Sequence, residues 1–548
     1  MTSDVLTQEK RLLNRNKWTY SVGGIGRDMV YQLVATFFIT YIQFALDLST
    51  AQFSVIGVLL IIGRVWDGIN DPIMGGIVDN TRSKWGKFKP WILTGAILTG
   101  IAIILMFNFR PDNGWHFVIF FGIIYFFWEI AFTLNDIPYW SLLPNLAEKK
   151  KDRDQITMLV VVFAALGAFL ANGVISFFTV GNALQGYTII SISFVIIFLA
   201  CTCLTVFGVK EPKLTEKQEK AEKISIKQMF KAIKNNDQLL WSSLALLLYT
   251  IGSNLLVALG YNFFYMELGY DGAMVMIFVA TFGVSTILIQ SFYAKIAKKF
   301  KRRTLLWASM LVLAFGYLML LLIGFVLIPI NLFTVCLFGA FVFGGQAVFY
   351  MVTIVNLTNT IEYNEYKTGV RNEAVMFSLR PFVTKLASAL YGGVVTLVLI
   401  ISGIYTLSQN VSQLEIQKNN FDTLESVELQ TEYIQNITNQ DIILDEADLT
   451  EEEKLVIYEA LATVSYEDSD EDGLEEMIIN ESVNETFRDI AQDDLGMRLT
   501  LRLAITILPT ILILGAYWIF KKKYIITEEF YEDMLEEISK KRKEKAEI

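Results

Sequence analysis

The chain has 548 residues, of which 53% are hydrophobic and 13% aromatic, and its mean hydropathy is +0.45. This composition is far too apolar for a soluble domain of this length, so it excludes a soluble protein and predicts a polytopic membrane protein with no nucleic-acid partner. The net charge is −10. The three cysteines, Cys201, Cys203 and Cys336, lack metal-ligand spacing and fall in apolar segments, which indicates core residues.

Twelve apolar segments are about as long as the ~20 residues that a helix needs to cross a bilayer. The N-terminus lacks the pattern of a cleavable signal, so the first segment is expected to be a retained helix. The predicted fold class is therefore an all-α membrane protein with twelve transmembrane helices. The segments are 22–46, 53–78, 91–109, 117–146, 157–180, 185–208, 238–263, 273–293, 304–326, 330–358, 374–404 and 499–520.

Lysine and arginine gather in alternate loops, at 10–17, 82–89, 149–153, 210–234, 295–303 and 521–523. By the positive-inside rule these loops and both termini are cytoplasmic, in a multi-pass protein of the plasma membrane whose bilayer is its lipid partner. We expect an N-terminal six-helix bundle (1–208), a cytoplasmic linker (209–237), helices 7–11 of a C-terminal bundle (238–404), an acidic extracellular insert (405–497), helix 12 (498–520) and a cytoplasmic tail (521–548).

The insert accounts for the acidity of the chain. Residues 408–494 hold 25 acids and three bases, a balance of −22, so the rest of the chain carries +12 against the total of −10. An odd number of predicted spans precedes it, which places it outside the cell. Segments such as 449–464 have helical apolar spacing, so the insert is expected to be a small helical module or a partly disordered acidic loop.

The second apolar segment contains four polar residues at membrane depth, Arg64, Asp67, Asn70 and Asp71. Each carries a desolvation cost unless it pairs or binds something. On a helix Asp67 and Asp71 are four residues apart, Asn70 lies beside Asp71 and Arg64 is one turn earlier, so all four share one face. This spacing predicts a cation-binding cage.

The fourth segment carries a second polar stripe. Glu129, Thr133, Asp136 and Trp140 are separated by 4, 3 and 4 residues and therefore lie on one helix face. Polar side chains in membrane helices usually face the bundle interior or a water-filled cavity. The stripe is therefore a candidate lining of a binding cavity.

Charged residues also occur in the first and eleventh segments. Arg27 and Asp28 lie about two turns into the first, so they either face the cavity or form an interfacial pair that reaches water. Lys385 lies about a dozen residues into an apolar run, where reaching water is hard, which favours a place in the binding pocket. After the second segment, Asp79 and Arg82 are candidates for a gating latch at a helix end.

Three sequence blocks carry a resemblance to a known family. RVWDGINDPIMGGIVDNTRSKWGKFKPWIL, FTLNDIPYWSLLP and EYNEYKTGVRNEA are similar to the glycoside/pentoside/hexuronide:cation symporters of the major facilitator superfamily, over both halves but not over 405–497. The resemblance implies two six-helix bundles that give alternating access to a central cavity. It implies Na+, Li+ or H+ as the coupling cation, no other cofactor, and cation ligands Asp67, Asn70, Asp71 and Thr133, with Asp67 and Asp71 as the carboxylates that hold Na+.

The resemblance also implies sugar-binding positions, which map onto Arg27, Asp28, Asp136, Trp140 and Lys385. The chain departs from the family pattern at three positions: Val161 replaces a sugar-binding arginine, Tyr350 a tryptophan and Arg380 a glutamine. Glu129 has no acidic counterpart that we can place in the typical member of the family, and we include Glu129, Tyr350 and Arg380 among the candidate substrate-binding residues. The cations Arg27, Arg380 and Lys385 together would suit a uronate carboxylate.

The expected function is therefore cation-coupled sugar symport, in which cation and sugar each raise the affinity for the other. Two alternatives remain. Related animal proteins suggest a lysophospholipid carrier, and the insert suggests a non-transporting sugar sensor. An enzyme is not expected, because the sequence offers no nucleophile and base pair, no phosphate-binding glycine loop and no His or Cys metal cluster.

Overall fold

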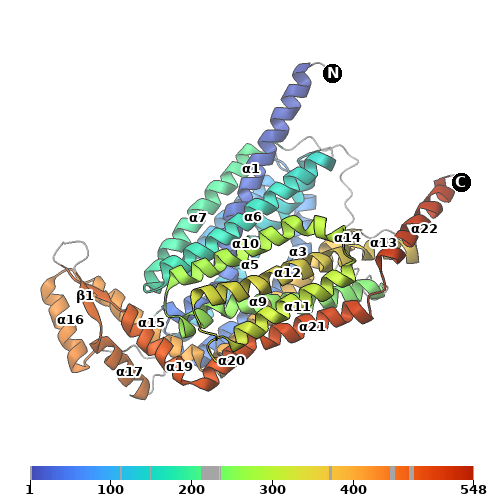
Figure 1. The fold of residues 1–548 in the computed structure, drawn as a ribbon. Helices are drawn as coiled ribbons and strands as arrows, with labels where there is room; N and C mark the ends of the chain where they lie inside the picture. The colour runs from blue at the N-terminus through green and yellow to red at the C-terminus, as the bar shows by residue number, and fades with distance from the viewer. Residues whose placement is uncertain are drawn as a thin grey trace.

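A computed structural model describes residues 3–111, 114–147, 150–210, 234, 236–326, 328–369, 373–442, 444, 451–467 and 474–546. Its body is a long bundle of helices, shown in Figure 1. The linker predicted at 209–237 lies almost entirely outside the described residues and stays a prediction.

Eleven stretches of the described chain are long and apolar enough to cross a membrane. This agrees with the predicted all-α membrane fold. The helices that form them are α3 (Thr50–Asn80), α4 (Lys89–Asn108), α5 (Gly114–Leu142) with a 3-10 turn (Leu143–Asn145), α6 (Lys150–Thr179), α7 (Ala183–Gly208), α9 (Asp237–Glu267), α10 (Gly272–Ala297), α11 (Arg302–Leu322), α12 (Leu332–Thr358) with α13 (Thr360–Thr368), α14 (Glu373–Ile401), and α20 (Leu495–Ile505) with α21 (Ile507–Lys522).

The first predicted span differs from these. It is divided into α1 (Ser3–Ala35) and α2 (Phe38–Ala45) by a break at Thr36 and Phe37. Arg27 and Asp28 make the membrane part of α1 polar, which explains why it is not among the apolar stretches. Nevertheless α1 packs against α6 and α7 inside the bundle.

Two groups of helices pack side by side. In the first group α4 packs against α5 and α7, and in the second α11 packs against α12 and α9 against α21. The groups meet where α3 packs against α14 and where α6 packs against α10. A close approach fixes α5 within the first group, because a Cβ on Gly95 of α4 would lie 2.4 Å from the backbone nitrogen of Asn135. The Asn135 side chain donates to the carbonyl of Ile92 at 2.7 Å. This packing sets the rotation of α5 and hence the direction of its polar stripe.

The insert is folded where it is described. It contains α15 (Ile404–Asp422), α16 (Val427–Asn439), α17 (Glu451–Ala462), an antiparallel pair of strands β1 (Ser465–Glu467) and β2 (Glu476–Ile478), α18 (Asn480–Val483), a π-helical turn (Asn484–Asp489) and α19 (Ile490–Asp493). Phe421, Ile457 and Met477 are at most 1% exposed and form part of its core. The strand pair was not expected from the sequence.

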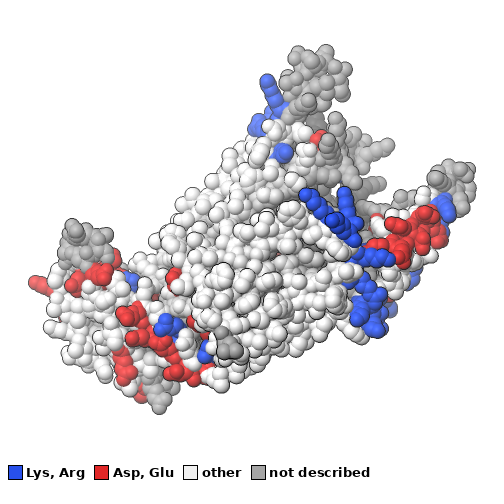
Figure 2. All heavy atoms as spheres, in the orientation of Figure 1, with Lys and Arg blue, Asp and Glu red and all other residues white. Residues whose placement is uncertain are grey.

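The insert and the two termini lie at opposite ends of the bundle (Figure 1). We call these the insert end and the termini end. Figure 2 shows acidic side chains over the insert, and at the termini end basic side chains beside the acidic residues of α22. The last helix, α22 (Glu528–Ala546), is attached there by an ion pair of Arg302 with Glu528 at 3.2 Å and by an exposed pair of Lys301 with Glu529 at 2.7 Å.

A buried ion cluster joins three helices near the insert end. Glu267, the last residue of α9, pairs with Arg498 at 2.8 Å and with Arg502 at 2.7 Å, both on α20. The Arg502 side chain is 0% exposed and also donates to the carbonyls of Leu320 and Leu321 in the last turn of α11, each at 3.2 Å. These ion pairs therefore hold α20, the helix by which the chain returns from the insert into the bundle, against α9.

Candidate functional site

The two predicted cation-binding carboxylates come together with a lysine from the other helix group. Lys385 of α14 places its Nζ 2.8 Å from Asp67 Oδ2 and 2.5 Å from Asp71 Oδ2, both on α3. Asp67 is 4% exposed, and the side chains of Lys385 and Asp71 are about one-fifth exposed. Lys385 was expected to bind sugar. In this structure its ammonium group instead occupies the centre of the carboxylate cage and links the two helix groups.

Neutral oxygens complete the cage. The Thr133 hydroxyl lies 3.1 Å from Asp67 Oδ1 and 2.9 Å from the carbonyl of Glu129, and it can donate to either. Within the described residues Asp71 Oδ1 and Asn70 Nδ2 are buried without a hydrogen-bond partner. Asp67, Asp71 and Thr133 are thus adjacent, and one carboxylate oxygen is free to take a ligand.

The ligand groups of the cage indicate that it could hold a cation. The described chain contains no group of three or more His, Cys, Asp or Glu side chains that could hold a metal ion. The cage offers two carboxylates and the neutral groups of Thr133 and Asn70. Oxygen groups of this kind are the ligands that hard cations prefer, so the set could hold a small cation or a proton.

Arg64 lies beside the cage but faces a different acid. Its Nη1 is 3.5 Å from Glu129 Oε1, and the two side chains are 8% and 1% exposed. The guanidinium also lies over the rings of Tyr31 and Trp128, at 5.5 and 5.6 Å from their centroids. Arg64 therefore compensates Glu129 in the core, and the assignment of Glu129 to sugar binding stays a prediction that its burial does not favour.

A second polar cluster joins α1 and α5. Arg27 pairs with Asp28 at 2.9 Å and also with Asp136. Its guanidinium lies 4.7 Å from the Trp140 ring centroid and 5.3 Å from that of Tyr139. The side chains of Asp28 and Asp136 are 20% and 21% exposed, so each keeps a face open. Four of the predicted sugar-binding residues are thus brought together, and Arg27 pairs within the bundle instead of reaching bulk water.

The remaining predicted residues lie farther along the helices. Arg380 of α14 is exposed and donates to the Tyr350 hydroxyl of α12 at 2.8 Å, so these two predicted residues form a pair. Arg82 lies exposed in the loop after α3, and the Asp79 side chain is outside the described residues. The predicted latch therefore stays a prediction.

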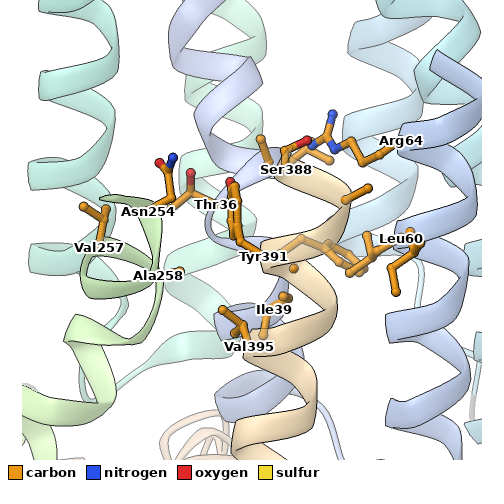
Figure 3. A pocket seen from close by; sticks show the side chains of 16 residues that line it. Thr36, Ile39, Leu60, Arg64, Asn254, Val257, Ala258, Ser388, Tyr391 and Val395 are labelled. Carbon is orange, nitrogen blue, oxygen red and sulfur yellow. The ribbon is translucent and has the colours of Figure 1, made fainter. Parts of the chain in front are cut away.

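A small cavity, which the sequence did not reveal, adjoins the cage on its insert side. It has a volume of about 60 Å³, room for a few water molecules, and side chains from both helix groups line it (Figure 3). Its polar lining comes from Thr36, Arg64, Asn254, Ser388 and Tyr391. In the sequence, the isolated Asn254 within an apolar segment could have indicated this cavity. The helix break at Thr36 has no comparable sequence feature.

Two groups of membrane helices with an ion-paired polar centre between them form a fold that solved structures of the major facilitator type share. The crystal structure of the D-xylose-proton symporter has this fold, with a TM-score of 0.53 and 16% identity, covering 73% of this chain and 90% of that one. A bacterial homolog of the human lysosomal transporter Spinster aligns over 94% of this chain and 98% of its own with a TM-score of 0.56 and 12% identity. These likenesses establish the fold.

The chain belongs to the MFS/sugar transport protein family, whose model matches residues 19–425. This confirms the resemblance to the glycoside/pentoside/hexuronide:cation symporters, a family of transporters and not of enzymes. The lactose permease of Lactobacillus delbrueckii subsp. bulgaricus is 30% identical over 73% of this chain and 64% of its own length. The raffinose carrier protein of Pediococcus pentosaceus is 26% identical over 71% and 62%.

A third relative, the glucuronide carrier protein homolog of Escherichia coli, is 24% identical over 70% of this chain and 83% of its own length. The chain spans slightly less than two thirds of the length of the lactose permease and the raffinose carrier.

Proposed function

We propose that the chain carries a sugar across the plasma membrane together with a monovalent cation, by alternating access. The observation that supports this most directly is the ion pair of Lys385 with Asp67 and Asp71, because it joins the two helix groups at a cage that otherwise suits a cation. If the two helix groups move relative to each other during transport, a coupling cation can replace the Lys385 ammonium group where α14 meets α3.

The tethered ammonium group explains how the carrier could return without cargo. Lys385 compensates the two carboxylates when no cation is bound, so the reoriented carrier does not expose a bare pair of acids to a low-dielectric interior. A Na+ or a proton that enters the cage competes with Lys385 for Asp67 and Asp71. The displaced ammonium can then donate to a sugar hydroxyl, and each ligand raises the affinity for the other.

The cluster around Arg27 suits the sugar. The partly open carboxylates of Asp28 and Asp136 accept hydrogen bonds from hydroxyls, and the Trp140 indole offers a flat apolar face to a pyranose ring. The relatives named for lactose and raffinose support a glycoside as the substrate. The Lys and Arg side chains gathered at the termini end in Figure 2 support a cytoplasmic location of both termini and an extracellular insert.

The test is uptake of sugar by the purified chain in proteoliposomes. A panel of neutral glycosides, pentosides and uronides is offered with an imposed Na+ or proton gradient, and Asp71→Asn serves as the cage variant. We expect one sugar to accumulate under one gradient, and the variant to lose at least tenfold of this accumulation. Accumulation unchanged by the variant would reject the cage, and no accumulation of any sugar would favour a lipid substrate or a sensor.

Arg380 distinguishes a charged from a neutral sugar. Its hydrogen bond in the described structure is to the neutral Tyr350 hydroxyl, so its charge remains available to a substrate carboxylate. If the substrate is a uronide, Arg380→Gln is expected to weaken its binding about tenfold or more, because a hydrogen bond to a charged group contributes ~1.5–3 kcal/mol. Binding of neutral glycosides to the same variant is the control, and equal effects on both sugars would contradict a uronate-binding role.

A further inference from the structure

The first helix of the insert, α15, has a polar face that is buried against the other helix group. The Tyr405 hydroxyl donates to the carbonyl of Leu48 at 2.7 Å, and its ring stacks on Phe53 with 3.9 Å between centroids. One turn later, Gln409 accepts from the Leu48 N–H at 3.0 Å and donates to the carbonyl of Gln43 at 3.1 Å. These bonds attach α15 to the segment between α2 and α3, which belongs to the first helix group.

Glu415, at the middle of α15, binds both helix groups at once. It is 3% exposed, and its carboxylate accepts from the backbone N–H of Gly181, between α6 and α7, at 3.2 Å and from that of Ala183, the first residue of α7. The same carboxylate accepts from the hydroxyl of Tyr270, between α9 and α10 of the second group. One buried side chain thus fastens two loops that must separate if the insert end opens.

A short link connects α15 to the second group. Only Ser402 and Gly403 separate α15 from α14. The backbone of Gly403 has φ +77°, a conformation that residues other than glycine rarely adopt. The short link keeps the start of α15 beside the end of α14, the helix that carries Lys385. A movement of α14 away from α3 would therefore pull on the bonds of α15 to Leu48 and Gly181.

The chemistry of this seam suits a contact that opens repeatedly. Its bonds join hydroxyl, amide, carboxylate and backbone groups, and each of these can exchange its partner for water when the seam opens. The net free energy of each bond is consequently small. Several such bonds together can keep the insert end closed and still allow it to open.

We propose that α15 is the outer gate of this transporter. Its hydrogen bonds to Leu48, before α3, and to Gly181, between α6 and α7, form a clasp. The strength of this clasp sets the balance between the inward-open and outward-open states. The proposal rests on the alternating access proposed above. It gives the insert a role in the transport cycle, with α15 as the acting part and the distal α16 as an accessory part.

The protonation of Glu415 adds a pH dependence to the clasp. Burial raises its pKa to about 7 from the ordinary 4.5, against the opposing hydrogen bonds of Tyr270, Ala183 and Gly181. In an open gate, with the carboxyl in water, the pKa returns toward 4.5, so closing takes up a proton. The resulting preference for the closed gate is complete below pH 4.5 and is lost as the external pH rises through 7. The titratable groups that face Glu415 are Lys418 on α15, Tyr187 on α7, Tyr265 on α9, and Tyr270.

The experiment measures access to the cavity from outside the cell. A single cysteine is placed in the cavity lining by Val257→Cys, in a background in which Cys201, Cys203 and Cys336 are replaced, and its labelling by a membrane-impermeant maleimide is timed. Gln409→Ala and Glu415→Ala are each expected to accelerate labelling about tenfold, because each removes two or more bonds of the clasp. Glu432→Ala, an exposed acid of α16, is the matched control and is expected to leave the rate unchanged.

A second comparison tests Glu415 itself. Glu415→Gln removes the titrating proton and keeps one oxygen that can accept from Gly181 and Tyr270, although its NH2 group cannot accept from Ala183, so its gate should not depend on pH. The labelling rate of the native Glu415 divided by that of Glu415→Gln should rise several-fold between external pH 5.5 and 8, and the division removes the pH dependence of the maleimide reaction. Folding of every variant is checked by its elution in size-exclusion chromatography.

Two results would overturn the proposal: a labelling rate unchanged in both Gln409→Ala and Glu415→Ala, or an equal acceleration in Glu432→Ala. A flat ratio between pH 5.5 and 8 would overturn the pH dependence. The labelling needs no knowledge of the cargo. A failure to transport sugar would thus leave the gate testable, and an inert clasp would leave sugar symport standing.

Discussion

Replacement of Lys385 by alanine is expected to reduce gradient-driven sugar accumulation by about a hundredfold or more. The variant leaves Asp67 and Asp71 together in a mostly buried cage with no cation of the protein's own. Removing one partner of a buried ion pair costs ~3–5 kcal/mol, and 1.4 kcal/mol corresponds to a factor of ten. The cation-free carrier should therefore become trapped on one side of the membrane. Initial rates of net uptake, compared with rates of exchange in preloaded vesicles, measure this effect.

The double variant Lys385→Ala with Asp71→Asn is the matched control. It restores the net charge of the cage, so the trapped state should be relieved and net movement of sugar down its own gradient should recover, without coupling to the cation. Lys385→Arg tests geometry, since it keeps the charge in a larger and planar group. If the single alanine variant accumulates sugar normally, Lys385 has no part in the return of the cation-free carrier.

Replacement of Glu267 by glutamine is expected to lower the free energy of unfolding by ~3–5 kcal/mol, because two arginines then lose their buried carboxylate partner. Arg502 is fully buried, and its remaining partners, carbonyls at the end of α11, compensate a charge poorly. The effect should appear as a thermal unfolding midpoint lowered by several °C in detergent micelles. It should also weaken the attachment of the insert, because α20 follows the insert directly.

Glu529→Gln provides the comparison. It breaks the pair with Lys301, in which both side chains are largely exposed, so no change in the unfolding midpoint is expected. An unfolding midpoint of Glu267→Gln that matches that of Glu529→Gln would show that the cluster does not stabilise the fold.

Polar residues within apolar segments were the signals that the sequence offered, and they were informative because burial of such groups in a membrane is costly. Asp67, Asp71 and Thr133 were predicted to be neighbours, and the structure places them together. Arg27, Asp28, Asp136 and Trp140 also meet as the family resemblance implied. Helical periodicity placed Asp67 with Asp71, and Asp136 with Trp140, on common helix faces, whereas the family resemblance implied that the faces of different segments meet.

The pairing of groups from different segments could not be predicted in the same way. Lys385 was assigned to the sugar, because an isolated lysine in an apolar run shows that it has a partner but not which one. The packing of α14 against α3 decides that the partners are Asp67 and Asp71. Likewise Arg64 shares a helix face with the cage in sequence, yet the position of α5 gives it Glu129 as its partner.

The amino-acid sequence by itself determined the membrane class, most helix positions, the family and the inventory of charged groups at membrane depth. These follow from hydropathy and periodicity, which are local properties of the chain. Only the tertiary structure decided which charges neutralise one another, where α1 breaks, and that α15 fastens both helix groups at the insert end. The reason is physical: an ion pair or a clasp between distant segments depends on the relative rotation and depth of packed helices, which no single segment encodes.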